Sequence, residues 1–138
     1  MARIVSMLRP SPTFATFFLL SGVLLACGLL IFSTVPAKWL SDTGWLTAPW
    51  DKAVHFLVYG LITLLLMLGT RMRRPLHVLL FVVLIGSLDE YQQLWIPGRT
   101  PDMGDWLADL LAGLVVSAIV LFIQERAMFG SLPEHTVK

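Results

Sequence analysis

Four long apolar stretches constrain this chain more than any other feature of its sequence. They cover about residues 13–35, 53–70, 76–94 and 105–123. About 20 helical residues, each rising 1.5 Å, cross the hydrocarbon core of a bilayer. Inside that core every backbone polar group needs a partner, and a helix satisfies its own. The sequence therefore predicts an all-α integral membrane protein, a four-helix bundle that forms a single domain over residues 1–138.

The composition favours the same class of protein. Of the 138 residues, 57% are hydrophobic and only 14% are charged, whereas an ordinary soluble domain has about 25% charged residues. The net charge of +1 excludes the strongly basic surface that is typical of nucleic-acid-binding proteins. We therefore expect membrane lipids as the surroundings and no nucleic-acid partner.

Basic residues and tryptophans predict the orientation of the bundle. Lysine and arginine are enriched on the cytoplasmic side of membrane proteins, and tryptophan prefers the headgroup layer. Both termini are therefore expected in the cytoplasm, in a multi-pass protein of the cytoplasmic (inner) membrane. The outer loop, residues 37–51, is expected to lie in the membrane interface. Seven basic residues lie on the predicted inner side (Arg3, Arg9, Arg71, Arg73, Arg74, Arg126, Lys138), three on the outer side (Lys38, Lys52, Arg99), and all five tryptophans on the outer side (Trp39, Trp45, Trp50, Trp95, Trp106).

Polar side chains recur at helical spacing at the outer ends of three apolar stretches. Residues three or four apart share one face of a helix. A charged group in hydrocarbon costs about 2.5–3.5 kcal/mol, so these faces are expected to meet in one site at the outer leaflet. Asp89 and Gln92 point elsewhere on their helix and are predicted to lie at the rim. The three faces are Lys52, His55 and Tyr59; Gly86, Glu90 and Gln93; and Asp102, Asp105, Asp109, Gly113 and Ser117.

This group of side chains suits acid–base chemistry and anion binding. Glu90 and Asp105 are the best candidates for general acid or base, with His55 as a further titrating group. Arg99 lies in a loop that two prolines and a glycine restrict, and its guanidinium can bind a phosphate or carboxylate through two hydrogen bonds. The residues expected to bind a ligand are Lys52, Tyr59, Gln93, Arg99, Asp102 and Asp109.

Two other interpretations of the polar residues stay open. The carboxylates could hold a divalent cation that bridges to a phosphate, although no spacing is diagnostic of a metal site, and no residue is assigned as a metal ligand. Alternatively, the polar residues have structural roles alone. Lys52 then extends to the headgroups, the first-turn aspartates interact with helix dipoles, and the remaining charged residues form ion pairs between helices. The sequence does not decide between an enzyme, a binding protein and a structural subunit. Gly113 and Ser117 would let another helix approach closely, and a homo-oligomer is one such arrangement.

Several segments resemble VanZ-like membrane proteins. The run Asp51–Tyr59, DKAVHFLVY, is similar to the D-K-x-x-H-F-x-x-Y segment of that family. The same holds for Glu90–x–x–Gln93 and for the run PGRTPD followed by x–x–Asp105 and later Gly113. The similarity covers roughly residues 36–123, in the family's order. One position departs from it, because the family usually has Asn where this chain has Asp109.

The resemblance implies a small polytopic protein of the cytoplasmic membrane. The member that gave the family its name is associated with low-level resistance to the glycopeptide teicoplanin. For this chain we accordingly expect a site at the outer leaflet that binds or acts on the headgroup of an envelope lipid or a cell-wall precursor. A link to glycopeptide resistance is a further expectation from the resemblance.

Overall fold

The computed structural model describes residues 9–36 and 50–129, which form four helices and no strand. Three helices have an 18-residue stretch apolar enough to cross a membrane, namely α2, α4 and residues 103–127 of α6. The predicted interfacial loop 37–51 lies outside the described residues, except for its last two, which begin α4. The all-α, four-helix prediction is confirmed. The helices are α2 (Pro12–Phe32), α4 (Trp50–Gly69), α5 (Pro75–Gln93) and α6 (Met103–Phe129).

The helix boundaries follow from local chemistry. Pro12 and Pro75 occupy the first turns of α2 and α5, where a missing N–H costs nothing. Ser11 caps α2 by accepting a hydrogen bond from the Phe14 N–H at 3.4 Å. Asp102 performs a similar role before α6, because its Oδ1 accepts the Gly104 N–H at 2.7 Å. Capping groups of this kind satisfy donors that a helix leaves without partners in its first turn.

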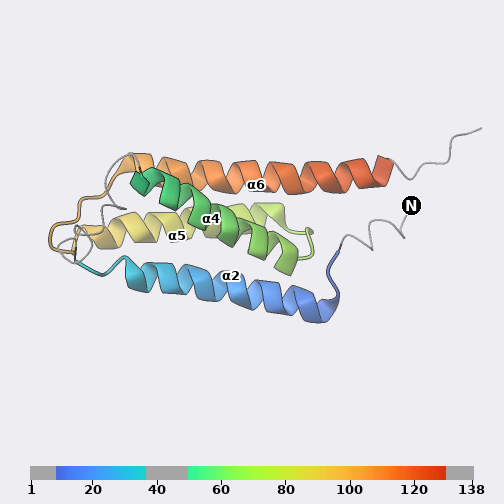
Figure 1. The fold of residues 1–138 in the computed structure, drawn as a ribbon, viewed down its shortest axis with the longest axis horizontal. Coiled ribbons are helices and arrows are strands. Elements are labelled where there is room, and N and C mark those ends of the chain that lie inside the picture. Colours follow the sequence, from blue (N-terminus) through green and yellow to red (C-terminus); the bar gives the residue numbers. More distant parts are fainter. Residues whose placement is uncertain (1–8, 37–49, 130–138) are drawn as a thin grey trace, which may run out of the picture.

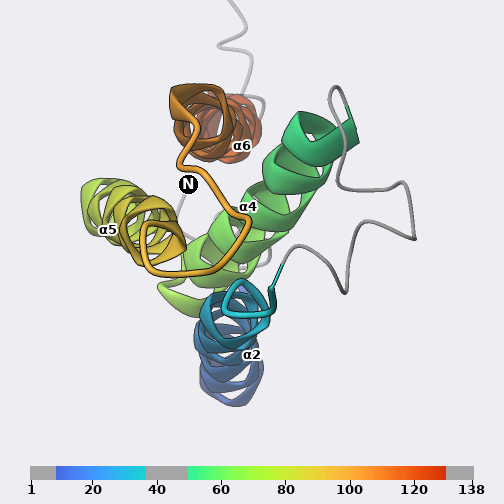
Figure 2. The same cartoon turned by 90° about the vertical axis from the view of Figure 1, so that its left-hand side faces the viewer.

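The helices run alternately up and down along the long axis of the molecule (Figure 1). Helix α4 contacts the other three helices, and it crosses between α2 and α6, which do not contact each other within the described residues. Seen end-on, α2 and α6 lie on opposite sides of α4, and α5 completes the bundle (Figure 2). The end where α4 and α6 begin and α2 and α5 finish is called the polar end below.

Glycines allow the closest helix approaches. A Cβ added to Gly69 would lie 2.6 Å from the backbone N and Cα of Leu19, so α4 meets α2 there at backbone distance. Gly113 of α6 faces α5, because its Cβ would lie 3.3 Å from Val82 Cγ1. Gly113 therefore serves packing within this chain, and the homo-oligomer stays a prediction.

The outer surface of the bundle is apolar, as a hydrocarbon solvent requires. Large apolar side chains are exposed along α2 and α6, among them Phe14, Leu24, Ile119 and Phe122. Helix α5 forms where the third span, residues 76–94, was predicted, but it is not among the three helices that are long and apolar enough to cross a membrane. The reason is its last turn, which contains Asp89, Glu90, Gln92 and Gln93.

Candidate functional site

The polar end gathers charged side chains from three helices and one loop. Helix α4 contributes its first turns, α5 its last turn and α6 its first turns, while residues 94–102 connect α5 to α6. The predicted candidates His55, Glu90 and Asp105 meet there, and each offers a nitrogen or oxygen atom within 4.8 Å of the others. The expectation that these faces share one site is therefore met for the three residues proposed for acid–base chemistry.

Lys52 lies among three carboxylates. Its Nζ is 2.5 Å from Asp102 Oδ2, 2.9 Å from Asp105 Oδ1 and 3.6 Å from Asp51 Oδ2. The Lys52 ammonium and the Gly104 N–H both donate to Asp102, and they lower the pKa of that carboxyl below its ordinary value. Because these anions already neutralise Lys52, it is a poor candidate for binding a ligand anion.

His55 is held in one orientation by Asp109. Its Nδ1 donates to Asp109 Oδ1 at 2.9 Å, and its ring stacks on Tyr59 with centroids 6.0 Å apart and planes 6° apart. The other ring nitrogen, Nε2, lies 4.0 Å from Asp105 Oδ2, which is too far for a hydrogen bond. In the neutral ring, Nε2 therefore carries a free lone pair.

Asp109 occupies space that a glycine leaves free. A Cβ added to Gly86 would lie 2.9 Å from Asp109 Oδ2. The Asp109 residue is only 2% exposed, and its Oδ2 has no hydrogen-bond partner among the described residues. Gly86 and Glu90 share a face of α5, so the glycine allows α6 to bring Asp109 beside the acid–base candidates.

Glu90 connects α5 to the loop before α6. Its Oε2 accepts the Asp102 N–H at 2.7 Å, and its Oε1 accepts from Gln93 Nε2 at 3.3 Å. Glu90 is 9% exposed, so its carboxylate is nearly enclosed. Of the predicted ligand-binding residues, Gln93 thus supports Glu90, whereas Tyr59 is fully buried behind His55 and its hydroxyl finds no partner in the described structure.

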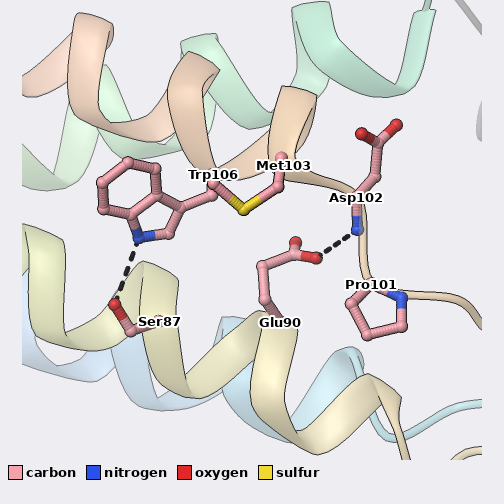
Figure 3. A pocket seen from close by; sticks show the side chains of 6 residues that line it. All are labelled: Ser87, Glu90, Pro101, Asp102, Met103 and Trp106. Atoms are coloured by element: carbon pink, nitrogen blue, oxygen red, sulfur yellow. Dashed lines mark hydrogen bonds between the residues drawn. The ribbon is translucent and has the colours of Figure 1, made fainter.

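A cavity of about 270 Å³ opens between α5 and α6 beside Glu90. Its walls differ in chemistry: Glu90 and Asp102 lie on one side, and the Trp106 ring on the other (Figure 3). The indole Nε1 of Trp106 donates to Ser87 Oγ at 3.1 Å and holds the ring in place. The lining residues are Ser87 and Glu90 from α5, Pro101 and Asp102 from the loop, and Met103 and Trp106 from α6.

Asp89 is buried and Gln92 is half-buried against α2, so the predicted place at the rim was wrong for Asp89. Asp89 is only 1% exposed. The Gln92 amide donates to the Leu30 carbonyl at 2.8 Å, and it also contacts Ser33 Oγ. The physical reason is that α5 packs against α2 as well as against α6, so a second face of α5 is buried. A polar i, i+3 pair within an apolar helix was the sequence signal for this second face.

Arg99 and Asp89 line a second cavity, of about 40 Å³, between α2, α4 and the loop. His55 and Ser33 complete its polar lining. Arg99 forms no ion pair with any residue of 9–36 or 50–129, and its Nε is buried without a hydrogen-bond partner there. Gly98, with φ of 78°, makes the turn that precedes it. Within the described residues, Arg99 is thus a cation at the polar end without an ion-pair partner, although it shares the cavity with Asp89.

The helices and this site together define a polytopic membrane protein with a polar cluster at one end of its bundle. The chain belongs to the VanZ/LLP1 family, whose model matches residues 11–124, most of its length. This match confirms the family resemblance. No curated protein and no solved structure matches the chain.

Proposed function

We propose that this protein binds an amphiphile of the cell envelope, an envelope lipid or a lipid-linked cell-wall precursor, with its headgroup at the polar end. The polar end would face the outer side of the cytoplasmic membrane. The observation that supports this most directly is the cavity between α5 and α6. The Glu90 carboxylate can accept hydrogen bonds from hydroxyl or amide groups, and Trp106 and Met103 offer an apolar wall. Ligand sites commonly combine an apolar lining with a few polar groups in this way.

Arg99 is the proposed partner of a phosphate or carboxylate on the same headgroup. Its guanidinium suits bidentate binding of either group, and it lacks an ion-pair partner in the described residues. Lys52 is less suited to this role because three carboxylates surround it. A headgroup that contains both an anionic group and several hydroxyl or amide donors, such as a phosphate-linked sugar, fits this combination of partners best.

Co-purification tests the binding proposal. The full-length protein is extracted in native lipids, and the bound lipids are identified by native mass spectrometry. We expect one phosphate-containing amphiphile per chain, and at least about tenfold weaker retention in Arg99→Gln, because a hydrogen bond to a charged group contributes about 1.5–3 kcal/mol. Arg73→Gln is the matched control, because it removes the same charge from an exposed position at the other end of the bundle. Equal retention in both variants would refute the proposal.

Chemistry on the bound headgroup is a separate question that the same preparation answers. If the site is catalytic, Glu90 and Asp105 are the acid–base candidates, and Glu90→Gln should abolish turnover while the protein stays in the membrane at normal amounts. If it is a binding protein, the purified wild-type protein should release its amphiphile unchanged. A protein that holds such a precursor would also alter its exposure to a glycopeptide, so susceptibility to teicoplanin should change with expression level.

A structural role is the second candidate, and the Lys52 cluster favours it. An ammonium shared by three carboxylates from α4, the loop and α6 joins these segments without any ligand. On this interpretation, variants at Glu90 and Asp105 lower the amount of folded protein and change nothing else. Quantifying protein in the membrane alongside lipid retention separates the two functions.

A further inference from the structure

Two groups of potential metal ligands lie next to each other at the polar end. One consists of His55, Glu90 and Asp105, and the other of Asp51, Asp102 and Asp105. In each group, one nitrogen or oxygen atom per residue lies within 4.8 Å of the others. Proximity alone does not make a cation site, since acidic groups also cluster around a lysine. The two groups differ in this respect.

The Asp51 group already contains a cation. The Nζ of Lys52 is within 3.6 Å of all three of its carboxylates. In the His55 group, Lys52 reaches only Asp105 Oδ1, and Glu90 has no ion-pair partner within the described ranges 9–36 and 50–129. Two carboxylates thus lie close to a histidine, and a cation compensates only one of them.

Asp109 fixes the orientation of the His55 ring. It accepts the Nδ1 hydrogen bond at 2.9 Å, which leaves the Nε2 lone pair free, 4.0 Å from Asp105 Oδ2. Metal-bound histidines almost always donate their second nitrogen to a carboxylate or carbonyl in this way. Asp109 is 2% exposed, and its Oδ2 has no partner in the described structure, so a further buried negative charge lies directly behind the ring.

The carboxylates of Asp105 and Glu90 are oriented by neighbouring residues as well. Lys52 holds Asp105 Oδ1 and leaves Oδ2 facing His55. The Asp102 N–H and the Gln93 amide hold Glu90. A carboxylate has about four lone-pair positions, so these hydrogen bonds are compatible with metal ligation. Zinc binds nitrogen and oxygen ligands at about 2.0–2.2 Å, and movements of roughly 1 Å by the side chains would achieve this geometry.

From this geometry we infer that His55 Nε2, Glu90 and Asp105 bind one divalent first-row transition-metal ion, zinc or manganese, with Asp109 positioning the histidine. One nitrogen and two carboxylate oxygens suit these ions better than calcium or magnesium, which prefer oxygen ligands alone. Three protein ligands leave a coordination position for water or for an anionic oxygen. The ion would offset the excess of carboxylates in a region where charge is expensive.

Titration with Co²⁺ tests the inference on the full-length protein in lipid nanodiscs after treatment with a chelator. Cobalt replaces zinc and absorbs visible light when nitrogen and oxygen atoms bind it. We expect one Co²⁺ per chain, displaced by Zn²⁺, and affinity reduced at least about 100-fold in Glu90→Gln and in His55→Gln. Asp109→Leu should lower the affinity about 10–100-fold, as loss of a group behind a ligand does. Asp51→Asn is the matched control, because it removes a carboxylate from the neighbouring group and should leave the affinity unchanged.

Several results would overturn the inference. They are the absence of Co²⁺ uptake above that of empty nanodiscs, an unchanged affinity in His55→Gln, and an equal loss in Asp51→Asn and Glu90→Gln. If a variant fails to fold, pulsed EPR of Mn²⁺ bound to the wild-type protein provides the test: a ¹⁴N coupling from imidazole is required, and its absence refutes ligation by His55. The titration measures metal uptake and not lipid retention, so its result is distinguishable from that of the Arg99 test above.

Discussion

Replacing Gly86 by alanine is expected to disconnect His55 from Asp109. The added methyl would lie 2.9 Å from Asp109 Oδ2 and 3.5 Å from Asp109 Cβ. Asp109 has a short side chain that the His55 hydrogen bond fixes at 2.9 Å, so its carboxylate cannot withdraw and keep that bond. The clash therefore falls on the one interaction that orients the histidine ring.

Two opposing contributions set the size of the effect. Alanine in place of glycine stabilises a helix interior by about 1 kcal/mol. Loss of a hydrogen bond to a charged group costs about 1.5–3 kcal/mol. The net expectation for Gly86→Ala is destabilisation by about 0.5–2 kcal/mol.

Gly60→Ala is the matched control on α4. Gly60 is also buried in a helix, but its added methyl would meet only Val116 Cγ2, at an ordinary 3.6 Å, and Ala112 Cβ, at 3.9 Å. This variant should gain up to about 1 kcal/mol from helix propensity. The two alanine variants should therefore differ by about 1.5–3 kcal/mol, and SDS titration in mixed micelles measures that difference.

A double variant locates the clash. In an Asp109→Ala background the obstacle is gone, so Gly86→Ala should become stabilising, like Gly60→Ala. Histidine ¹⁵N chemical shifts provide a second measurement, because loss of the Asp109 hydrogen bond allows both neutral tautomers of His55. If Gly86→Ala were as stable as Gly60→Ala and left the His55 signals unchanged, the contact between α5 and α6 described above would be incorrect.

Three further predictions concern other parts of the bundle. Gly69→Ala should separate α4 from α2, because its methyl would lie 2.6 Å from the Leu19 backbone; unfolding at lower SDS than wild type is expected, and an unchanged midpoint would contradict the crossing. Lys52→Met should cost about 1–3 kcal/mol, less than the 3–5 kcal/mol of a fully buried pair, because its side chain is 37% exposed; a more stable variant would argue against the ion-pair cluster. In a background without the native cysteine, Arg99→Cys should react with an impermeant thiol reagent from outside, and Arg73→Cys only after permeabilisation; the reverse pattern would invert the proposed orientation.

The helices could be predicted from apolar length, and their boundaries shifted for identifiable reasons. Helix α4 begins at Trp50 rather than near residue 53, because Asp51 and Lys52 are stabilised in its first turn by charge. Helix α6 continues to Phe129, beyond the predicted 123, because a helix can extend past the hydrocarbon core. The length of an apolar stretch predicts the membrane-embedded part of a helix and not the full length of that helix.

The candidate site could be predicted in part. Spacing placed His55, Glu90 and Asp105 on helix faces, and the cost of charge in hydrocarbon required those faces to meet, as they do. Spacing could not show that Lys52 belongs to the carboxylates, because that depends on the path of the loop that ends at Asp102. It also missed Asp89, since periodicity identifies one buried face of a helix and α5 has two.

Interhelical attraction explains only part of the polar end. Lys52 and its carboxylates satisfy one another, and so do His55 and Asp109 Oδ1. A network selected for packing alone should leave little else, because a buried polar atom without a partner costs about 1–3 kcal/mol. Yet Asp109 Oδ2 and Arg99 Nε are buried without partners in the described structure. Asp109 Oδ2 belongs to a carboxylate beside His55, and Arg99 Nε belongs to a guanidinium that lines the small cavity. Contacts between the described helices leave both atoms without a partner, and the anion proposed above would give the Arg99 guanidinium one.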